Sequence, residues 1–339
     1  MPSESEQPRL LSRRRRPSVT GVAGLVILVG MVLLCIVSLP WTFGIVETGP
    51  DLVHGQRRFE AGNLSLNLLP PSWMSMSTDD QKRLDAAIEA GEFIPGRLLG
   101  TDKHGRDYLA RCLVGGTISL GIGLSSALIA VIIGTAYGVV SGYYGGRLDA
   151  FLMRCVDVLY GLPYILLVVL LAVAVDGIVQ RMGTQVSTQW AQVINVITLL
   201  VAIGGISWLT MSRVIRGQVL SLKARPYMET CRAIGVPLGR QFRLHLLPNL
   251  IAPIVVYATL AVPAAILSES FLSFLGIGVR EPLPSWGNLA ADGLNELNMV
   301  TSRWWLLFWP CFLIGMTLLS LNFLGDHLRE RFDPTAGTA

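Results

Sequence analysis

The segment with the clearest capacity for chemistry is LGTDKHGRD at residues 99–107, which places two carboxylates and an imidazole close together. Asp102, His104 and Asp107 carry the oxygen and nitrogen donors with which proteins bind divalent metal ions. A metal site needs a convergent set of ligands, however, and a single histidine among charged side chains is usually solvated. No second group of ligands lies nearby in the sequence, so we predict no metal ion here.

A structural role explains the same segment better. Glycines at positions 100 and 105 allow tight turns, because glycine adopts positive φ angles without steric cost. Asp102, Arg106 and Asp107 can then form hydrogen bonds or ion pairs. We predict that these contacts dock the segment on the helix that follows it.

No other pattern in the chain predicts catalysis. The sequence has neither the GxSxG turn of serine hydrolases nor the HExxH motif of zinc proteases. A phosphate-binding loop needs a lysine directly after glycine, whereas Lys82, Lys103 and Lys223 follow Gln, Asp and Leu. The five cysteines are scattered and form no CxxC or Cys/His cluster. We therefore predict no catalytic residue, cofactor, metal ion or disulfide, and any ATP would have to be bound by another protein.

The composition is that of a membrane protein. Hydrophobic residues make up 52% of the 339 residues and charged residues only 15%, against about 25% charged residues in soluble domains. The mean hydropathy is +0.54. The net charge of +4 is modest, and no basic stripe alternates with aromatic residues. We predict contact with membrane lipid and no nucleic-acid partner.

The chain begins with a polar segment, residues 1–18, that includes the arginine run 13–16. The apolar segment that follows, residues 19–39, is too long for the core of a signal peptide and lacks a cleavage site of small residues. We predict that it is a first transmembrane helix, with the arginines holding the N-terminus in the cytoplasm.

Residues 40–117 differ in kind, since they are rich in Pro, Asn, Ser and charge. We predict that this segment lies outside the cytoplasm. A Thr-x-x-Gln capping box starting at residue 78 predicts a short helix over residues 78–91. Leu84 and Ile88 would share its packed face.

From residue 118 to 325 the chain reads as a core of five further membrane spans, followed by a cytoplasmic tail at 326–339. The predicted spans are Ile118–Val140, Phe151–Val179, Val193–Met211, Leu250–Phe271 and Trp304–Phe323. Arginine and lysine gather in the loops that would face the cytoplasm and are scarce in the short outer loops, which favours both termini inside. The expected fold class is an all-α integral membrane protein with six transmembrane helices.

Side chains within these spans predict how the helices meet. In the third span, Arg154 and Asp157 are spaced to pair along the helix, and Pro163 should kink it. Small residues recur at every fourth position of the second span, where a neighbouring helix could approach closely. They are Ala130, Gly134, Gly138 and Gly142.

The long polar and basic segment of the core is Ala224–Asn249. Pro226 suits the first turn of a helix, Gly235 would end that helix, and Pro248 would break a second helix before the next span. Two short helices meeting at an angle would therefore project from the membrane as a hairpin.

The predicted elbow of this hairpin is apolar and is rimmed by arginines at 232, 240 and 243. Ala233, Ile234 and Val236 would lie at the elbow. An apolar tip with a charged rim suits a groove on a partner protein, but a basic hairpin lying on lipid would use the same residue types. The residue types leave both interpretations open.

The order of several motifs favours a hairpin that docks on a partner protein over one that lies on lipid. Glu229–Gly235 followed by His245–Asn249 resembles the EAA loop of permease subunits of bacterial ATP-binding-cassette importers. Two positions depart from it, since Thr230 and Cys231 stand where that family has alanines, and residues 41–96 resemble nothing in it. Other stretches resemble the C-type permease of the dipeptide/oligopeptide (peptide/nickel) branch. They are LGTDKHGRD (99–107), SGYYGGRLD (141–149) with RCVDVLYGLP (154–163), ESFLSFLGIGVREPLPSWG (269–287) and GDHLRERFDP (325–334).

The resemblance implies a type I importer permease fold in the cell inner (plasma) membrane, with the loop 224–249 as a coupling helix. It implies as partners two cytoplasmic ATPase subunits, a second, B-type permease subunit and a periplasmic or lipid-anchored substrate-binding protein. It carries over Glu229, Gly235 and Pro248 as coupling positions. On physical grounds we add Ala233, Ile234 and Val236 as contacts to a groove.

The substrate implied is a di- or oligopeptide, although relatives in the same branch resemble carriers of nickel and other small solutes. No residue can be assigned to substrate from the sequence. The main alternative is a stand-alone ion-coupled secondary transporter, for which Asp176 and Glu269, both near the predicted outer ends of spans, would be the candidate coupling residues. A membrane scaffold without transport is a further alternative.

Overall fold

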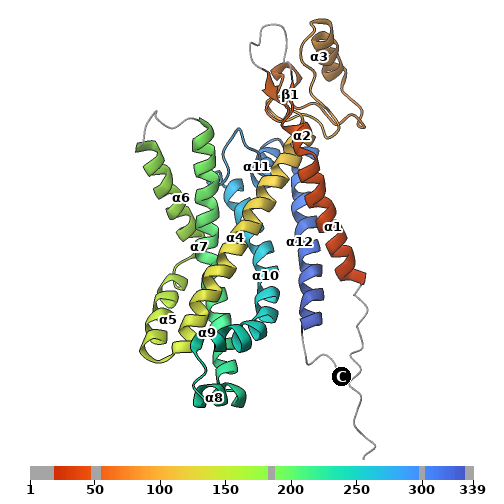
Figure 1. Cartoon of the computed structure of the whole chain (residues 1–339). Coiled ribbons are helices and arrows are strands. Elements are labelled where there is room, and N and C mark those ends of the chain that lie inside the picture. Colours follow the sequence, from red (N-terminus) through yellow and green to blue (C-terminus); the bar gives the residue numbers. More distant parts are fainter. Residues whose placement is uncertain (1–18, 47–54, 182–187, 298–301, 333–339) are drawn as a thin grey trace, which may run out of the picture.

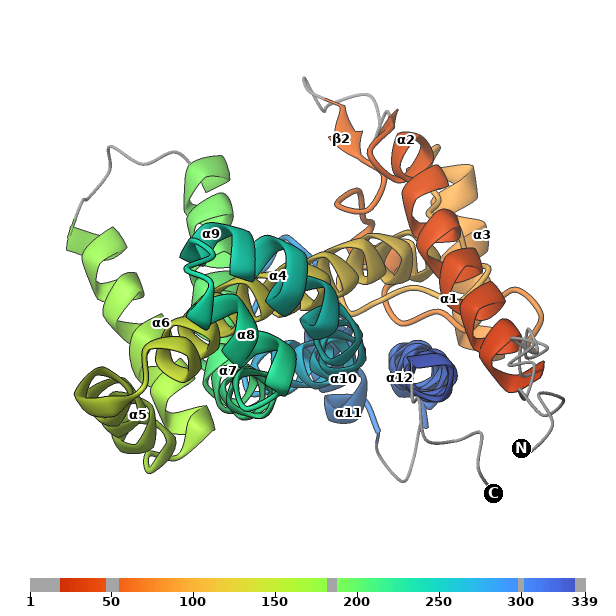
Figure 2. The ribbon, with the colours of Figure 1, turned by 60° about the horizontal axis from the view of Figure 1, so that its bottom comes forward.

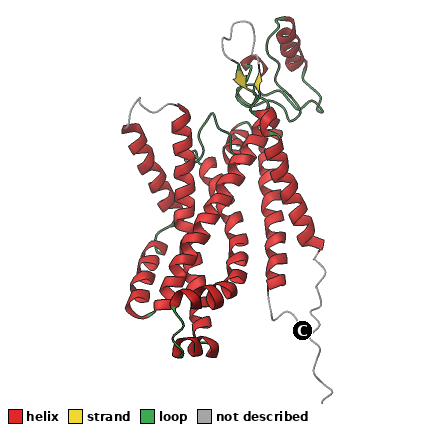
Figure 3. Ribbon diagram, in the orientation of Figure 1, coloured by secondary structure: helices red, strands yellow, loops and turns green. Residues whose placement is uncertain are grey.

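The computed structural model describes residues 19–46, 55–181, 188–297 and 302–332, so the predicted tail 1–18 and residues 333–339 lie outside it. Long helices run along one direction, a small lobe caps one end, and two short helices lie at the other end (Figures 1 and 3). The elements, in chain order, are α1 (Val19–Val37), α2 (Leu39–Thr42), β1 (Ile45–Val46), β2 (Gln56–Arg57), η1 (Leu64–Leu66), α3 (Thr78–Glu89), α4 (Tyr108–Tyr144), α5 (Gly146–Tyr160), α6 (Tyr164–Arg181), α7 (Thr188–Lys223), α8 (Pro226–Ala233), α9 (Leu238–Gln241), η3 (Phe242–Leu246), α10 (Leu247–Phe274), α11 (Trp286–Asn295) and α12 (Trp305–Phe332).

The all-α membrane fold is confirmed. Within the described ranges, five helices are long and apolar enough to cross a membrane, and a sixth span is present if the bent pair α5–α6 counts as one. Large apolar side chains are exposed on these helices, among them Val26 of α1, Leu128 of α4 and Phe312 of α12. Lipid can cover such a surface, whereas soluble proteins rarely expose contiguous apolar patches of this extent to water.

The third span is broken rather than kinked, which corrects the prediction of a kinked helix over 151–179. α5 and α6 meet at an angle of 86°. Pro163 explains the break, because it has no N–H group to continue the hydrogen-bond ladder and its ring clashes with the preceding turn. The predicted pair of Arg154 and Asp157 is also wrong. Asp157 accepts a hydrogen bond from Arg213 of α7 at 2.8 Å instead, since that partner lies within reach on the neighbouring helix.

Helix α4 begins at Tyr108, so the core starts before the predicted residue 118 and the segment ahead of it is shorter than 40–117. Asp107 caps the helix, because its carboxylate accepts hydrogen bonds at 3.0 and 3.3 Å from the backbone N–H groups two and three residues further on. Similarly, α7 and α12 continue beyond the predicted ends of their spans. Hydropathy marks the apolar stretch, whereas caps and packing decide where the helix stops.

The small-residue stripe is where α4 packs against α7. A β-carbon added at Gly134 would lie 2.5 Å from the side chain of Met211, and one added at Gly138 would lie 2.5 Å from the backbone oxygen of Ser212. Both distances are far shorter than van der Waals contact, so the two backbones approach as closely as glycine allows.

The lobe, residues 39–46 and 55–106, holds the antiparallel pair β1–β2 and helix α3. The predicted helix at 78–91 is present, but Ser77 rather than Thr78 is its N-cap, and the Ser77 hydroxyl accepts the backbone N–H three residues on at 3.1 Å. Leu84 is buried as expected, whereas Ile88 is 54% exposed. Ala87 packs there instead of Ile88, because Leu84 and Ala87 are three residues apart and share the helix face that contacts the rest of the lobe.

The segment between the predicted spans 250–271 and 304–323 contains a helix, α11, that sequence reasoning missed. Ser285 and Asn288 form a reciprocal capping box at its start. Trp286 is fully buried, and its indole N–H donates to the backbone oxygen of Cys112 on α4 at 3.0 Å. Helix α11 therefore fixes the end of α4 that lies next to the lobe.

Candidate functional site

Helices α8 and α9 form a projecting hairpin at the end of the molecule farthest from the lobe (Figures 1 and 2). α8 starts at Pro226, as predicted, because proline suits the first turn of a helix. It ends at Ala233, and Gly235 then adopts a φ of +75° that reverses the chain. A β-carbon at Gly235 would meet nothing within 4 Å, so backbone conformation alone favours glycine there.

The prediction that Pro248 breaks the second helix is wrong. α9 passes into the π-helical turn η3, in which the N–H of Leu247 donates to the carbonyl of Phe242, and then directly into α10. Pro248 is the second residue of α10 and follows directly on the π-helical turn, so the helix continues through it although proline has no N–H group. The hairpin is therefore joined to α10 by continuous helix.

The hairpin is packed onto the long helices by a buried apolar cluster. Met228 of α8, Leu246 of η3 and Leu250 of α10 are all fully buried, and they contact Ile215 and Val219 of α7. Burying such side chains stabilises the contact by about 1.5–3 kcal/mol each. The hairpin is therefore held at its base while its tip projects.

The tip, defined as residues 233–238, presents apolar side chains to solvent. Ile234 is 72% exposed and Leu238 is 50% exposed. Among the residues predicted for coupling, Glu229, Ala233, Gly235 and Pro248 are also exposed and Val236 is half-buried. Pro248 does not belong to the tip, because it lies where the hairpin joins α10.

The two residues that depart from the family pattern fit the helix. The hydroxyl of Thr230 donates to the carbonyl of Pro226 at 3.0 Å, a bond within α8. The carbonyl of Cys231 accepts the N–H of Val236 at 3.0 Å and so closes the turn at Gly235. The hairpin backbone therefore forms without the two alanines.

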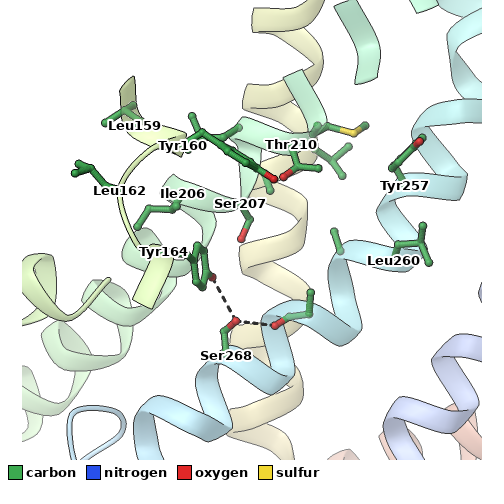
Figure 4. A pocket seen from close by; sticks show the side chains of 16 residues that line it. Leu159, Tyr160, Leu162, Tyr164, Ile206, Ser207, Thr210, Tyr257, Leu260 and Ser268 are labelled. Atoms are coloured by element: carbon green, nitrogen blue, oxygen red, sulfur yellow. Dashed lines mark hydrogen bonds between the residues drawn. The ribbon is translucent and has the colours of Figure 1, made fainter. Parts of the chain in front are cut away.

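A second candidate site, which sequence reasoning missed, is a cavity of about 590 Å³ among α4, α5, α6, α7 and α10. Figure 4 shows side chains from these helices around it. The lining residues are mostly apolar and include no charged residue. Those that carry hydroxyl groups are Tyr160, Tyr164, Ser207, Thr210, Tyr257 and Ser268.

The break between α5 and α6 forms one wall of this cavity. Tyr160 and Leu162 lie at the break, and Tyr164 follows it. The Tyr164 hydroxyl donates to Ser268 Oγ at 3.3 Å, and Ser268 donates to the Ala264 carbonyl at 2.8 Å (Figure 4). Irregular backbone at membrane depth is tolerated where it is buried in protein or lines a water-filled cavity. Pro163 was the one signal for this site, and it predicted a bend without showing what the bend encloses.

The segment 99–107 is structural, as predicted. Gly100 and Gly105 have φ angles of +91° and +68°. Asp102 accepts a hydrogen bond from Arg106 Nε at 2.6 Å, and its carboxylate lies 3.3 Å from the fully buried guanidinium of Arg111 on α4. No group of three potential metal ligands occurs among the residues described by the structure.

Glu281 joins this ion-pair network from the loop before α11. Arg106 donates to it at 3.1 Å, and Arg111 and Lys103 lie 3.7 and 3.8 Å away. Burial by itself would raise the pKa of the Glu281 carboxyl, but the cations at 106, 111 and 103 together hold that pKa below its usual value. The network thus ties the 99–107 segment to the segment that carries α11.

Glu269 is fully buried away from the cavity. Its carboxylate accepts a hydrogen bond from Ser273 at 2.8 Å, and the hydroxyls of Ser119, Ser270 and Ser285 surround it. These partners come from α4, α10 and the start of α11, so Glu269 fastens three elements together. The side chain of Asp176 lies outside the described part.

The geometry defines a class of protein: a polytopic membrane protein with a cavity among its spans and a helical hairpin projecting from one end. The fold is shared with a solved ABC importer, the MetNI methionine ABC transporter in inward-facing conformations. The match has a TM-score of 0.52 at 18% identity and covers 67% of this chain and 98% of that chain. This chain therefore has the fold of the matched chain of that transporter.

Sequence comparison gives the family. Residues 134–337 match the model of the binding-protein-dependent transport system inner membrane component, and the chain belongs to that family. It is 45% identical to the oligopeptide transport system permease protein OppC of Escherichia coli over 70% of this chain and 72% of that protein. It is 44% identical to the dipeptide transport system permease protein DppC of Bacillus subtilis, over 69% and 68% of the two chains. OppC of Haemophilus influenzae is 42% identical over 69% of each chain.

Proposed function

We propose that this chain is the permease subunit of an ATP-driven importer that moves di- or oligopeptides across the inner membrane. The observation that carries the proposal is the projecting hairpin, which exposes an apolar tip in a chain without a phosphate-binding loop. The peptide permeases among its relatives support the substrate class. A related small solute such as nickel is the alternative substrate.

In this proposal both termini lie in the cytoplasm together with the hairpin. The start of α1, the end of α12 and the hairpin lie toward the same end of the molecule (Figure 1). The lobe and α11 then face outward, where a periplasmic or lipid-anchored binding protein would deliver the substrate. A second, B-type permease subunit would complete the membrane pathway.

The hairpin tip would dock in a groove on a cytoplasmic ATPase subunit. Exposed Ile234 and Leu238 supply the apolar contact, and arginines at 232 and 240 supply a charged rim. The hairpin projects beyond the ends of α7 and α10 (Figure 1), which favours a protein groove over the plane of the lipid. α8 follows α7 closely and η3 runs into α10, so ATPase closure would move both spans.

The cavity would be this subunit's share of the substrate pathway. Transporters commonly place discontinuous helices beside their substrate, and the 86° break between α5 and α6 lies on the cavity wall. Hydroxyl groups without charge suit a peptide backbone, whose N–H and C=O groups need hydrogen bonds whatever the side chains are.

Copurification and uptake test the proposal. The tagged chain should bring down an ATPase and a second permease from detergent extract, and the reconstituted complex with its binding protein should take up a labelled tripeptide when ATP is supplied.

Glu229→Lys and Gly235→Pro should uncouple uptake from ATP hydrolysis while membrane insertion persists. Glu89→Lys on exposed α3 is the matched charge reversal and should keep wild-type uptake. Full ATPase stimulation and uptake by both hairpin variants would contradict the coupling role, and purification without an ATPase would contradict the importer.

A further inference from the structure

We infer that Gln241 and Tyr143 link the hairpin tip to α4, and this inference rests on the proposed function. Gln241 is 3% exposed, and its amide bonds in two directions. Nε2 donates to the backbone oxygen of Val236 in the tip at 2.6 Å, and Oε1 accepts from the Tyr143 hydroxyl, in the last turn of α4, at 2.9 Å. One buried side chain therefore joins two elements that are far apart in the sequence.

This link matters because α4 does not adjoin the hairpin in the chain. α7 leads into α8 and η3 leads into α10, so both of those spans follow the hairpin through the chain itself. α4 reaches the tip through Tyr143, whose ring also lies 6.0 Å from the guanidinium of Arg232. Lys223 at the end of α7 donates to the Tyr143 carbonyl at 2.6 Å. Tyr143 thus lies where α4, α7 and the tip meet.

Helix α4 can carry a displacement from the tip to the rest of the molecule. It is continuous from Tyr108 to Tyr144, and Ala130 and Val131 near its middle line the cavity. Its other end is fixed by the buried bond from Trp286. A packed helix moves as a rigid unit, so a shift of the tip reaches the cavity wall through the Gln241–Tyr143 bond.

The test uses the purified complex with its ATPase and second permease subunits in liposomes. Tyr143→Phe removes the hydroxyl, and Gln241→Met removes the amide at similar volume. Tyr144→Phe is the matched control, because Tyr144 is adjacent and 61% exposed. The half-buried and exposed cysteines at 155, 231 and 311 are changed to serine, and Val131→Cys places a thiol on the α4 wall of the cavity.

The first readout is maleimide labelling at position 131 without nucleotide and after trapping with ATP and vanadate. The wild type and Tyr144→Phe should show a change in labelling rate between the two states. Tyr143→Phe and Gln241→Met should reduce that change about fivefold, the factor expected for one net hydrogen bond. The double variant should lose no more than either single variant, because both remove the same bond.

The second readout is labelled tripeptide taken up per ATP hydrolysed, which should also fall about fivefold while the yield of complex stays unchanged. The inference would be overturned if Tyr143→Phe showed the same change in labelling rate as the wild type. It would also be overturned if the variant lowered the yield of complex without lowering uptake per ATP, because the bond would then be merely structural. A wild-type complex that takes up no tripeptide counts against the peptide substrate alone, since the labelling readout uses no substrate.

Discussion

Arg111 shows at the scale of single residues why the LGTDKHGRD motif is composed as it is. A buried guanidinium costs several kcal/mol unless it is paired, and Asp102 and Glu281 lie 3.3 and 3.7 Å from it. The aspartates of the motif therefore pair with cations and cap α4. Their structural role was predictable from residue type, but the partnership with Glu281 was not, since that residue lies far along the chain.

Glu281→Gln should remove a pH-dependent part of the stability. The folded-state pKa of Glu281 is held below its unfolded value, so its carboxylate stabilises the fold above the unfolded pKa of about 4.3. That stabilisation is lost as the pH falls through the lower folded pKa. Between about pH 5 and pH 3, the Tm of the wild type in detergent should fall more steeply than that of the variant.

The control for this pH series is Glu89→Gln on the exposed face of α3, which should follow the wild type throughout. Parallel Tm curves for the wild type and Glu281→Gln would show that the ion-pair network does not depend on the Glu281 charge.

At the scale of elements, the contact of α4 with α7 follows from glycine spacing. The four-residue repeat predicted a close approach, and the structure adds which helix approaches and which atoms limit it. At Gly138 the nearest limiting atom belongs to the backbone, the Ser212 carbonyl oxygen, and backbone cannot rotate aside as a side chain can.

Gly138→Ala should therefore destabilise the protein by about 1–3 kcal/mol, because the added methyl group would lie 2.5 Å from the Ser212 oxygen. Gly121→Ala is the control on the same helix, since nothing lies within 4 Å of its β-carbon position. That change should be neutral or stabilise α4 by up to about 1 kcal/mol through helix propensity. Thermal unfolding in detergent measures both, and equal effects would mean that the glycine stripe is not a packing surface.

At the scale of the whole molecule, the hairpin and the lobe lie at opposite ends of the helices (Figure 1). The proposed orientation places the hairpin and the turn between α4 and α5 inside the cell. The lobe would lie outside, although residues such as Arg57 and Arg58 carry positive charge there, because long loops translocate largely regardless of charge.

A membrane-impermeant maleimide should therefore distinguish the two ends. Glu89→Cys on α3 should be labelled in intact spheroplasts, and Arg147→Cys in the first turn of α5 should be labelled only in inverted vesicles. Both positions are exposed, and the background again lacks the cysteines at 155, 231 and 311. Labelling at position 147 from outside would reverse the orientation and move the hairpin away from any cytoplasmic ATPase.

The sequence by itself determined the features that depend on local properties. Runs of apolar residues predicted the membrane spans, Pro226 and Gly235 predicted the ends of α8, and the repeat of small residues predicted a tight helix contact. Each of these follows from the hydrophobicity or backbone preference of residues that are neighbours in the chain.

Only the tertiary structure decided the features that depend on which distant residues meet. The sequence could not predict the 86° break around Pro163 or the cavity that it lines. It also could not predict that the helix runs through Pro248 or that Asp157 pairs with Arg213. The bond from Gln241 to Tyr143 belongs to the same group. A proline restricts the local backbone, but the packing of the surrounding helices decides whether it bends, breaks or simply starts a helix.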